Sequence, residues 1–246
     1  MNDKFKRFLK DSKYQNMGPT DQSLGKPQPP LFGKLEGQRI PLPKMDAFDA
    51  PDVSLNEAIS QRKSYRKFVR KPIAIEELSY ALWSTQGVKK VVEGRATFRT
   101  VPSAGARHAF DTFVLINYMD ELESGLYFFD ALEHALVFVA GYDTVKDKIL
   151  AGCLNQRMVI EASVCFFWVA DIYRMAYRYG ERGFRYLLLD AGHIAQNLYL
   201  IAETMQAGTC AIGAFDDDLL NDALNLDKEA YAVLYVGPLG KRPYEG

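Results

Sequence analysis

The sequence predicts an α+β fold in which a mostly antiparallel sheet is flanked by helices. Short runs of β-branched and aromatic residues recur along the chain, as is typical of strands. The links between these runs are mostly hairpins or helices. A long helix near the C-terminal end is apolar over most of its surface and must be covered on several sides. One such cover is a second copy of the chain, so we expect a homodimer.

The first 50 residues differ in composition from the rest of the chain. Residues 17–44 are rich in Pro, Gly and polar side chains, which predicts an extended N-terminal arm with little regular structure over residues 1–50. Residues 51–246 then form one folded domain. Two interpretations of the arm stay open, a disordered tail and a segment that packs on a neighbouring surface. The apolar residues available for packing are Leu31, Phe32, Ile40 and Leu42.

Three helices follow from capping residues and apolar periodicity. Ser54, with Glu57 three residues later, is a capping box that starts the first helix. The second covers residues 73–87 and ends in glycine. The longest covers residues 184–208, and we expect Gly208 to close it.

The strands are predicted from dense β-branched and aromatic runs. Residues 112–118 form a buried strand, and residues 125–141 form two strands around a turn. Residues 162–171 form a further strand. The last, over residues 230–240, is expected to end in a tight turn.

Composition excludes several classes of protein. The 246 residues carry a formal net charge of −1, which argues against a nucleic-acid coat. None of the three cysteines lies in a CxxC spacing, so we expect no metal site. An odd number of unclustered cysteines is typical of a protein in a reducing compartment. No apolar run approaches the roughly 20 residues of a membrane helix, and the N-terminus does not resemble a signal peptide. We therefore expect a cytoplasmic protein with neither nucleic-acid nor membrane partners.

The stretch QRKSYRKFVRK (61–71) concentrates positive charge in this nearly neutral chain. In an extended segment Arg62, Ser64 and Arg66 share one side, and two guanidinium groups around a hydroxyl are a good receptor for a phosphate. Lys63, Tyr65 and Lys67 then point to the other side. The alternative is a solvated basic face. A turn after the last strand would bring Lys241 and Arg242 to the same phosphate.

Two loops of small residues allow a ligand to approach the backbone closely. The first holds Pro102, Ser103, Ala104 and Gly105, and the second runs over residues 211–214. Asp216 then caps a helix. Each loop has an ordinary tight turn as its alternative. The chain contains neither GxGxxG nor a P-loop, so the sequence gives no support to a separate nicotinamide-binding Rossmann domain.

These stretches together resemble the FMN-dependent nitroreductase superfamily, and within it the SagB-type dehydrogenase branch. The matching pieces, in family order, are QRKSYRKF, IEELSYALWSTQGV, RTVPSAGARH, ESGLYFFD, YGERGFRYLLLDAGHIAQNLYLIAE, CAIGAFDDD and VGPLGKR. The resemblance implies a nitroreductase-like fold, an intertwined homodimer and FMN bound at the subunit interface. The positions it assigns to cofactor binding are Arg62, Lys63, Ser64, Arg66, Pro102, Ser103, Ala104, Gly105, Ile212, Gly213, Ala214, Lys241 and Arg242.

The resemblance gives each group a role. The residues of the basic run and the C-terminal pair match phosphate and ribitol contacts, and the loop around Ser103 matches the segment along the flavin ring. Gly213 and Ala214 match the segment whose backbone N–H groups face N5 and O4. In such a site the flavin carries out the redox chemistry, so the protein does not need a nucleophile and a general base of its own.

The chain departs from the branch at two places. His108 stands where Tyr is usual after the SAGA motif, and is either a proton donor to the substrate or a surface histidine in contact with water. The resemblance implies that the branch oxidises azolines to azoles and that this activity depends on a Lys–Tyr pair. The stretch here that stands closest to the pair is Arg185–Tyr186, and Arg cannot act as a base near neutral pH. Tyr186 is our second catalytic candidate. His193 is expected to be packed inside the core.

Three functions are compatible with the sequence. The first is an FMN-dependent oxidoreductase that accepts electrons from NAD(P)H and passes them to an electron-poor acceptor of the nitroaromatic or quinone type, by a ping-pong mechanism. The second is a SagB-type dehydrogenase that oxidises peptide azolines to azoles beside a peptide-modifying partner. The third is a flavin-binding protein without turnover.

Overall fold

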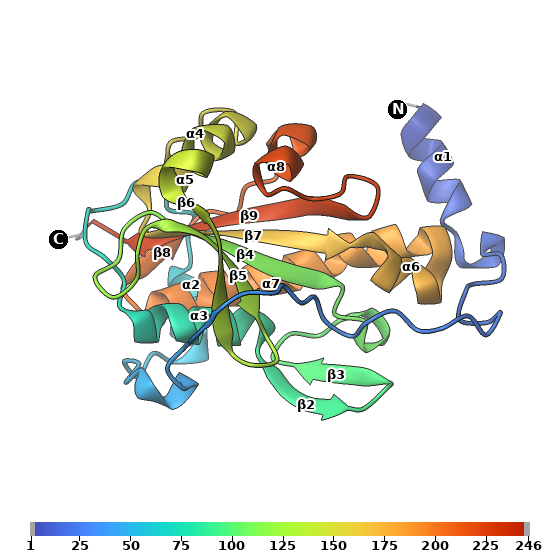
Figure 1. The fold of residues 1–246 in the computed structure, drawn as a ribbon, viewed down its shortest axis with the longest axis horizontal. Coiled ribbons are helices and arrows are strands. Elements are labelled where there is room, and N and C mark those ends of the chain that lie inside the picture. Colours follow the sequence, from blue (N-terminus) through green and yellow to red (C-terminus); the bar gives the residue numbers. More distant parts are fainter. Residues whose placement is uncertain (1–2, 244–246) are drawn as a thin grey trace.

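A seven-stranded antiparallel sheet forms the centre of the structure, a computed structural model that describes residues 3–243 (Figure 1). The strand order is β1-β6-β5-β4-β7-β9-β8, which confirms the predicted α+β fold. A hairpin, β2–β3, lies apart from this sheet. The strands are β1 (Arg39–Pro41), β2 (Val88–Val92), β3 (Ala96–Arg99), β4 (Phe110–Ile116), β5 (Gly125–Asp130), β6 (Ala135–Gly141), β7 (Val164–Asp171), β8 (Ala207–Thr209) and β9 (Tyr231–Lys241).

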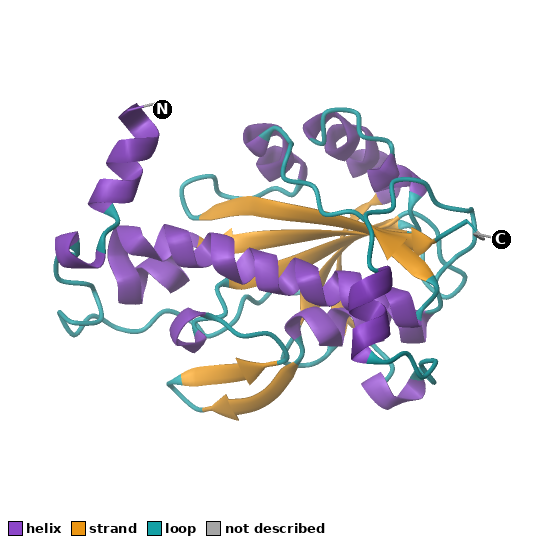
Figure 2. Ribbon diagram, turned by 180° about the vertical axis from the view of Figure 1, so that it is seen from behind, coloured by secondary structure: helices purple, strands orange, loops and turns teal. Residues whose placement is uncertain are grey.

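Helices cover both faces of the sheet. The long α7 crosses one face together with α2, α3 and α6, and α4, α5 and α8 lie on the other (Figures 1 and 2). The helices are α1 (Asp3–Asp11), α2 (Leu55–Gln61), α3 (Ile75–Gln86), α4 (Tyr142–Gly152), α5 (Met158–Glu161), α6 (Ile172–Tyr179), α7 (Gly183–Thr204) and α8 (Asp217–Ala223). Within residues 3–243, no helix has both the length and the hydrophobicity needed to cross a membrane.

The central strand β7 explains why its sequence is apolar without alternation. Phe166 and Trp168 pack into the core on the α7 side, and Cys165 and Phe167 pack into the core on the opposite side. Because helices cover both faces, every one of these side chains is fully buried. The two cores therefore fix the sheet between two helical layers.

The predicted helix starts are confirmed, but one predicted helix end is wrong. The Ser54 side chain accepts a hydrogen bond from the Glu57 N–H at 3.2 Å, and Asp216 caps α8 in the same way. The long helix ends at Thr204, and not at Gly208. Gln206 takes the left-handed conformation (φ 51°) and turns the chain into β8, where Gly208 is a strand residue.

The N-terminal arm makes more contacts with the fold than its composition suggests. Residues 39–41 form the edge strand β1, paired with β6, and Leu42 is buried. The composition gave no sign of α1, because this charge-rich helix is fixed by contacts with distant residues. The ring of Phe8 meets Phe184 of α7 edge to face at 5.7 Å. A domain boundary near residue 50 stays a prediction.

Candidate functional site

The basic run and the loop after β8 meet at one tyrosine of α7. The hydroxyl oxygens of Ser64 and Tyr199 lie 3.0 Å apart, and the Ala211 N–H donates to the same Tyr199 oxygen at 2.8 Å. The Arg62 guanidinium lies over the Tyr199 ring, 5.2 Å from its centroid. We call Arg62, Ser64, Tyr199 and residues 211–214 the Tyr199 group. The sequence reasoning did not single out Tyr199.

Backbone pairing holds the basic run beside β8. The Tyr65 N–H donates to the Thr209 carbonyl at 2.9 Å, and Ser64 bridges Thr209 in a parallel register. Gly208 permits this approach, since a Cβ there would lie 2.6 Å from the Cβ of Tyr65. Tyr65 is buried, while Ser64 and Arg66 are exposed. Lys63 is exposed and lies 5.2 Å from the centroid of the Tyr65 ring.

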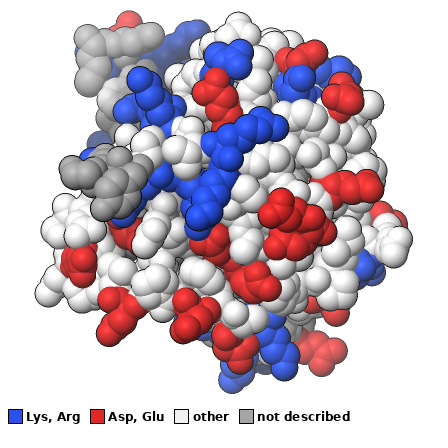
Figure 3. Space-filling model, turned by 90° about the vertical axis from the view of Figure 1, so that its left-hand side faces the viewer, with Lys and Arg blue, Asp and Glu red and all other residues white. Residues whose placement is uncertain are grey.

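The C-terminal cations lie next to the run but are paired with carboxylates. Lys241 forms an ion pair with Glu77, and Arg242 binds Glu203 at 2.6 Å and the Tyr65 hydroxyl at 3.2 Å. The predicted tight turn before them is wrong, because β9 continues without a break to Lys241. Figure 3 shows Lys and Arg side chains crossing this end of the molecule in a band, with acidic side chains beside them.

The segment over residues 212–214 presents open backbone donors. Ile212 and Val236 exchange two backbone hydrogen bonds, and the side-chain amide of Gln156 donates to the Ala214 carbonyl at 2.7 Å. Gly213 and Ala214 are exposed, and among residues 3–243 neither N–H has a hydrogen-bond acceptor. Fixed, unpaired N–H groups beside cations and hydroxyls fit a ligand with a polar heterocyclic edge and a phosphate. The residues of this site therefore suit a flavin mononucleotide.

The loop around Ser103 is attached to α7 at a different point. The Ser103 hydroxyl donates to Asp190 at 2.6 Å, and the Ala104 N–H donates to the other carboxylate oxygen at 3.2 Å. Burial raises the pKa of Asp190, and these two donors oppose the shift. Gly105 adopts φ 56°, and a Cβ there would lie 2.3 Å from the Tyr179 hydroxyl, so this position requires glycine. Pro102 and Gly105 are exposed.

Within one chain, α7 separates this loop from the Tyr199 group. Asp190 and Tyr199 are nine residues apart on one helix, which is two and a half turns and roughly 13 Å along its axis. Their side chains therefore leave α7 on opposite sides. The structure brings the predicted cofactor residues together as two groups and not as one.

His108 does not occupy the surface position that one interpretation expected. It is 5% exposed, and its pKa falls to about 3 because of burial and the nearby charges of Arg99, Arg107 and Arg174, against a hydrogen bond to the Thr97 backbone. The imidazole is therefore neutral at pH 7 and closed off from solvent. This location gives no support to His108 as a proton donor to substrate.

The other singled-out residues of α7 lie at its N-terminal half. The Tyr186 hydroxyl accepts from Arg182 at 2.7 Å, and its ring meets Tyr179 at 4.7 Å. Arg185 donates to the Leu9 carbonyl and to the Ser12 hydroxyl, both at 2.7 Å, so its guanidinium holds the N-terminal arm. His193 is exposed, and the prediction of a packed core histidine is wrong.

Comparison with known proteins identifies the family. The model of the nitroreductase family matches residues 59–241. The chain belongs to the nitroreductase family. MJ1384 of Methanocaldococcus jannaschii, whose name classes it as a nitroreductase, is 30% identical over 189 residues, which cover 77% of this chain and 93% of that protein. The resemblance seen in the sequence is thus confirmed, and the protein is an oxidoreductase of this family.

Solved structures of this family share the fold. A nitroreductase structure from Anabaena variabilis matches with a TM-score of 0.74 and 23% identity, covering 95% of this chain and 45% of that one. A nitroreductase from Desulfovibrio desulfuricans, solved in complex with FMN, matches with a TM-score of 0.54 and 18% identity, covering 79% and 90%.

Other proteins similar to this nitroreductase-family chain have names that refer to trifolitoxin processing or microcin synthesis. The trifolitoxin-processing protein TfxB of Rhizobium leguminosarum is 26% identical over 156 residues, which cover 61% of this chain and 41% of that protein. The Escherichia coli microcin synthetase McbBCD, with truncated pro-MccB17 bound, matches with a TM-score of 0.61 and 16% identity, covering 99% of this chain and 95% of that one. These similarities are consistent with the SagB-type branch.

Proposed function

We propose that this member of the nitroreductase family is an FMN-dependent oxidoreductase. It takes electrons from NAD(P)H and passes them to an electron-poor acceptor, a nitroaromatic or a quinone, with the two substrates alternating at one site. The observation that carries the proposal is the pair of open N–H groups at Gly213 and Ala214, held beside Arg62 and Ser64 through Tyr199. Because the chain belongs to the nitroreductase family, we take the ligand of this arrangement to be a flavin.

The residues of the chain have distinct roles in this proposal. Arg62 and Arg66 bind the phosphate, and Ser64 adds a hydroxyl oriented by Tyr199. Lys241 and Arg242 keep the adjacent chain segments in place through Glu77 and Glu203. The N–H groups of Gly213 and Ala214 orient the ring edge without any titratable side chain. When bound, FMN supplies the two-electron redox chemistry.

We further propose that the site is completed across a homodimer. The Ser103 loop and the Tyr199 group leave α7 on opposite sides, so one ligand reaches both groups only if they come from two chains. The outer face of α7 also exposes large apolar side chains, with Phe184 46%, Leu188 48% and Leu189 59% exposed. Apolar surface of this kind is typical of a protein–protein interface.

A second candidate function is the oxidation of azolines on a peptide. The similarity to TfxB and to McbBCD favours it and implies a peptide-modifying partner. Arg185 argues against azoline oxidation. Its guanidinium stays protonated near neutral pH, so it cannot act as a base, and it is hydrogen-bonded to the N-terminal arm. The first function therefore has the stronger support.

The deciding experiment is anaerobic reduction of the purified protein, followed by its visible spectrum. A yellow protein that is bleached by NADH or NADPH, and regains its colour with a nitroaromatic or quinone, supports the proposal. A yellow protein that is not bleached contradicts it and favours the peptide dehydrogenase or a flavin-binding protein without turnover. A colourless protein that does not bind added FMN overturns the cofactor assignment.

A further inference from the structure

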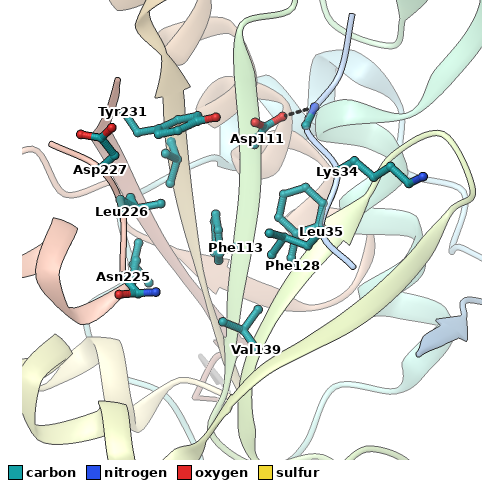
Figure 4. A pocket seen from close by; sticks show the side chains of 13 residues that line it. Lys34, Leu35, Asp111, Phe113, Phe128, Val139, Asn225, Leu226, Asp227 and Tyr231 are labelled. Atoms are coloured by element: carbon teal, nitrogen blue, oxygen red, sulfur yellow. Dashed lines mark hydrogen bonds between the residues drawn. The ribbon is translucent and has the colours of Figure 1, made fainter. Parts of the chain in front are cut away.

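A cavity of about 220 Å³ lies on the face of the sheet opposite α7 (Figure 4). Its floor consists of side chains from four adjacent strands, namely Phe113 of β4, Phe128 of β5, Val139 of β6 and Val169 of β7. The arm over residues 33–35 forms one wall, and the loop over residues 224–227, between α8 and β9, forms the other. The cavity shares no lining residue with the Tyr199 group, so it is a separate site.

The lining of the cavity favours an aromatic occupant. Phe113 and Phe128 meet edge to face, with ring centroids 5.3 Å apart. Leu35, Val139 and Leu226 complete a mostly apolar surface, and the polar or charged lining residues are Lys34, Asp111, Asn225, Asp227 and Tyr231. An apolar cavity of ~150 Å³ is large enough for benzene, so this one has room for one or two fused rings.

The polar end of the cavity favours an uncharged occupant. Both carboxylate oxygens of Asp111 bind Arg174 at 3.1 Å, and one of them also accepts from the Gly33 N–H at 3.0 Å. The charge of Asp111 is therefore compensated. The other charged residues that line the cavity, Lys34 and Asp227, are exposed to solvent, which screens their charges, so an ionised ligand would gain little in return for its lost hydration.

Tyr231 supplies a hydrogen-bonding group at this end. The Tyr231 side chain extends from its strand into the cavity, with the hydroxyl directed toward the Asp111 end (Figure 4). Burial raises the pKa of Tyr231, and the nearby Asp171 and Asp111 raise it further. The hydroxyl thus stays protonated at neutral pH and is available to a polar substituent of a bound ring.

We propose that this cavity is a second small-molecule site, which binds an uncharged aromatic compound of one or two rings with a hydrogen-bonding substituent at Tyr231. Because Gly33 and Leu35 belong to its wall, an occupant also fastens the N-terminal arm to the sheet. The inference rests on this cavity alone and does not depend on the proposed activity.

The test is titration of the FMN-loaded protein with 2-naphthol, by calorimetry and by ligand-observed NMR. We expect one saturable site per chain and no change in the flavin absorption spectrum. Val139→Phe fills the cavity and should weaken binding at least tenfold. Val91→Phe, the same change at an exposed position of β2, should leave binding unchanged. Tyr231→Phe should weaken binding about fivefold by removing the hydroxyl.

Three results would overturn the proposal. They are the lack of a saturable site in the native protein, equal binding by native protein and Val139→Phe, and binding that perturbs the flavin spectrum. If Val139→Phe does not fold, Leu35→Trp fills the same cavity from the arm and leaves the sheet unaltered. Equal binding by native protein and folded Leu35→Trp would overturn the proposal in the same way.

Discussion

The hydroxyl oxygens of Ser64 and Tyr199 lie 3.0 Å apart, although 135 positions separate these residues in the sequence. Tyr199 also holds the Ala211 N–H and supports the guanidinium of Arg62 with its ring. One side chain of α7 therefore sets the relative positions of the phosphate-binding run and the loop with the open donors. We class Tyr199 as a positioning residue of the proposed flavin site.

Tyr199→Phe tests this role directly. The substitution keeps the ring and removes the hydroxyl that joins the two segments, so FMN should bind roughly five- to tenfold more weakly, on the basis of about 1 kcal/mol per hydrogen bond lost. Fluorescence titration of the apoprotein with FMN measures the change. The matched control is Tyr173→Phe, which removes an exposed hydroxyl bonded to Asp21 and should leave FMN affinity unaltered. Equal affinities in the two variants would remove Tyr199 from the site.

The double variant Arg62→Ala/Arg66→Ala should fold and purify largely without flavin. Charge-assisted hydrogen bonds contribute roughly 1.5–3 kcal/mol each, so the loss of two reduces FMN affinity by two orders of magnitude or more. The ratio of flavin to protein absorbance after purification reports occupancy. Lys67→Ala/Lys71→Ala removes the same net charge from exposed neighbours and should retain the flavin. Full occupancy of the first double variant would refute the phosphate assignment.

Mixed dimers can reveal whether the site spans two chains. Gly105→Val damages the Ser103 loop by forcing a Cβ toward the Tyr179 hydroxyl, and Arg62→Ala/Arg66→Ala damages the other group. Each homodimer should be inactive. Co-expression of the two should restore up to half of the native NAD(P)H-dependent turnover per mixed dimer, because one of its two sites receives both intact groups. If both groups belong to the same chain, the mixed dimer contains no intact site and stays inactive.

The buried His108 should make stability depend on pH. Its pKa falls from an ordinary value of about 6.5 to about 3 in the folded chain, so the unfolded state binds more protons between these values. The associated stability is complete above pH 6.5 and is lost as the pH falls toward 3. Between pH 7 and pH 5 the loss is about 2 kcal/mol.

Urea denaturation at pH 7 and pH 5 measures this loss. His108→Asn is a suitable comparison, since Asn tolerates the positive φ of this position (43°) and does not titrate. The variant should lose about 2 kcal/mol less than the native protein between the two pH values. Equal losses would show that His108 is protonated in the folded chain at pH 5.

The strands and helix starts were predictable from sequence because each depends on its neighbours in the chain. β7 is uniformly apolar because both of its faces are buried, and Ser54 and Asp216 cap helices through residues three positions away. The basic run and the small-residue loops were found for the same reason. Their composition alone indicates cations and exposed backbone donors.

What the sequence did not predict depends on contacts between distant segments. Tyr199 is one of many large residues on α7, and only the crossing of two remote segments over it reveals its function. His193 lies on a helix that is apolar on most sides, so the pattern could not tell the outward side from the core side. Two ion pairs also join distant parts of the chain, Lys241 with Glu77 and Arg242 with Glu203. Nothing in the sequence around these residues indicates their partners.

The strand order has a consequence for how the chain reaches its native state. Within residues 3–243, β9 is the last strand along the chain, yet it lies inside the sheet between β7 and β8, while β1, the first strand, pairs with β6 almost a hundred residues later. The β8 edge of the sheet cannot form until β9 is available to pair with it, and the β1 edge must wait for β6. Folding should therefore be slow, as expected of topologies with high contact order.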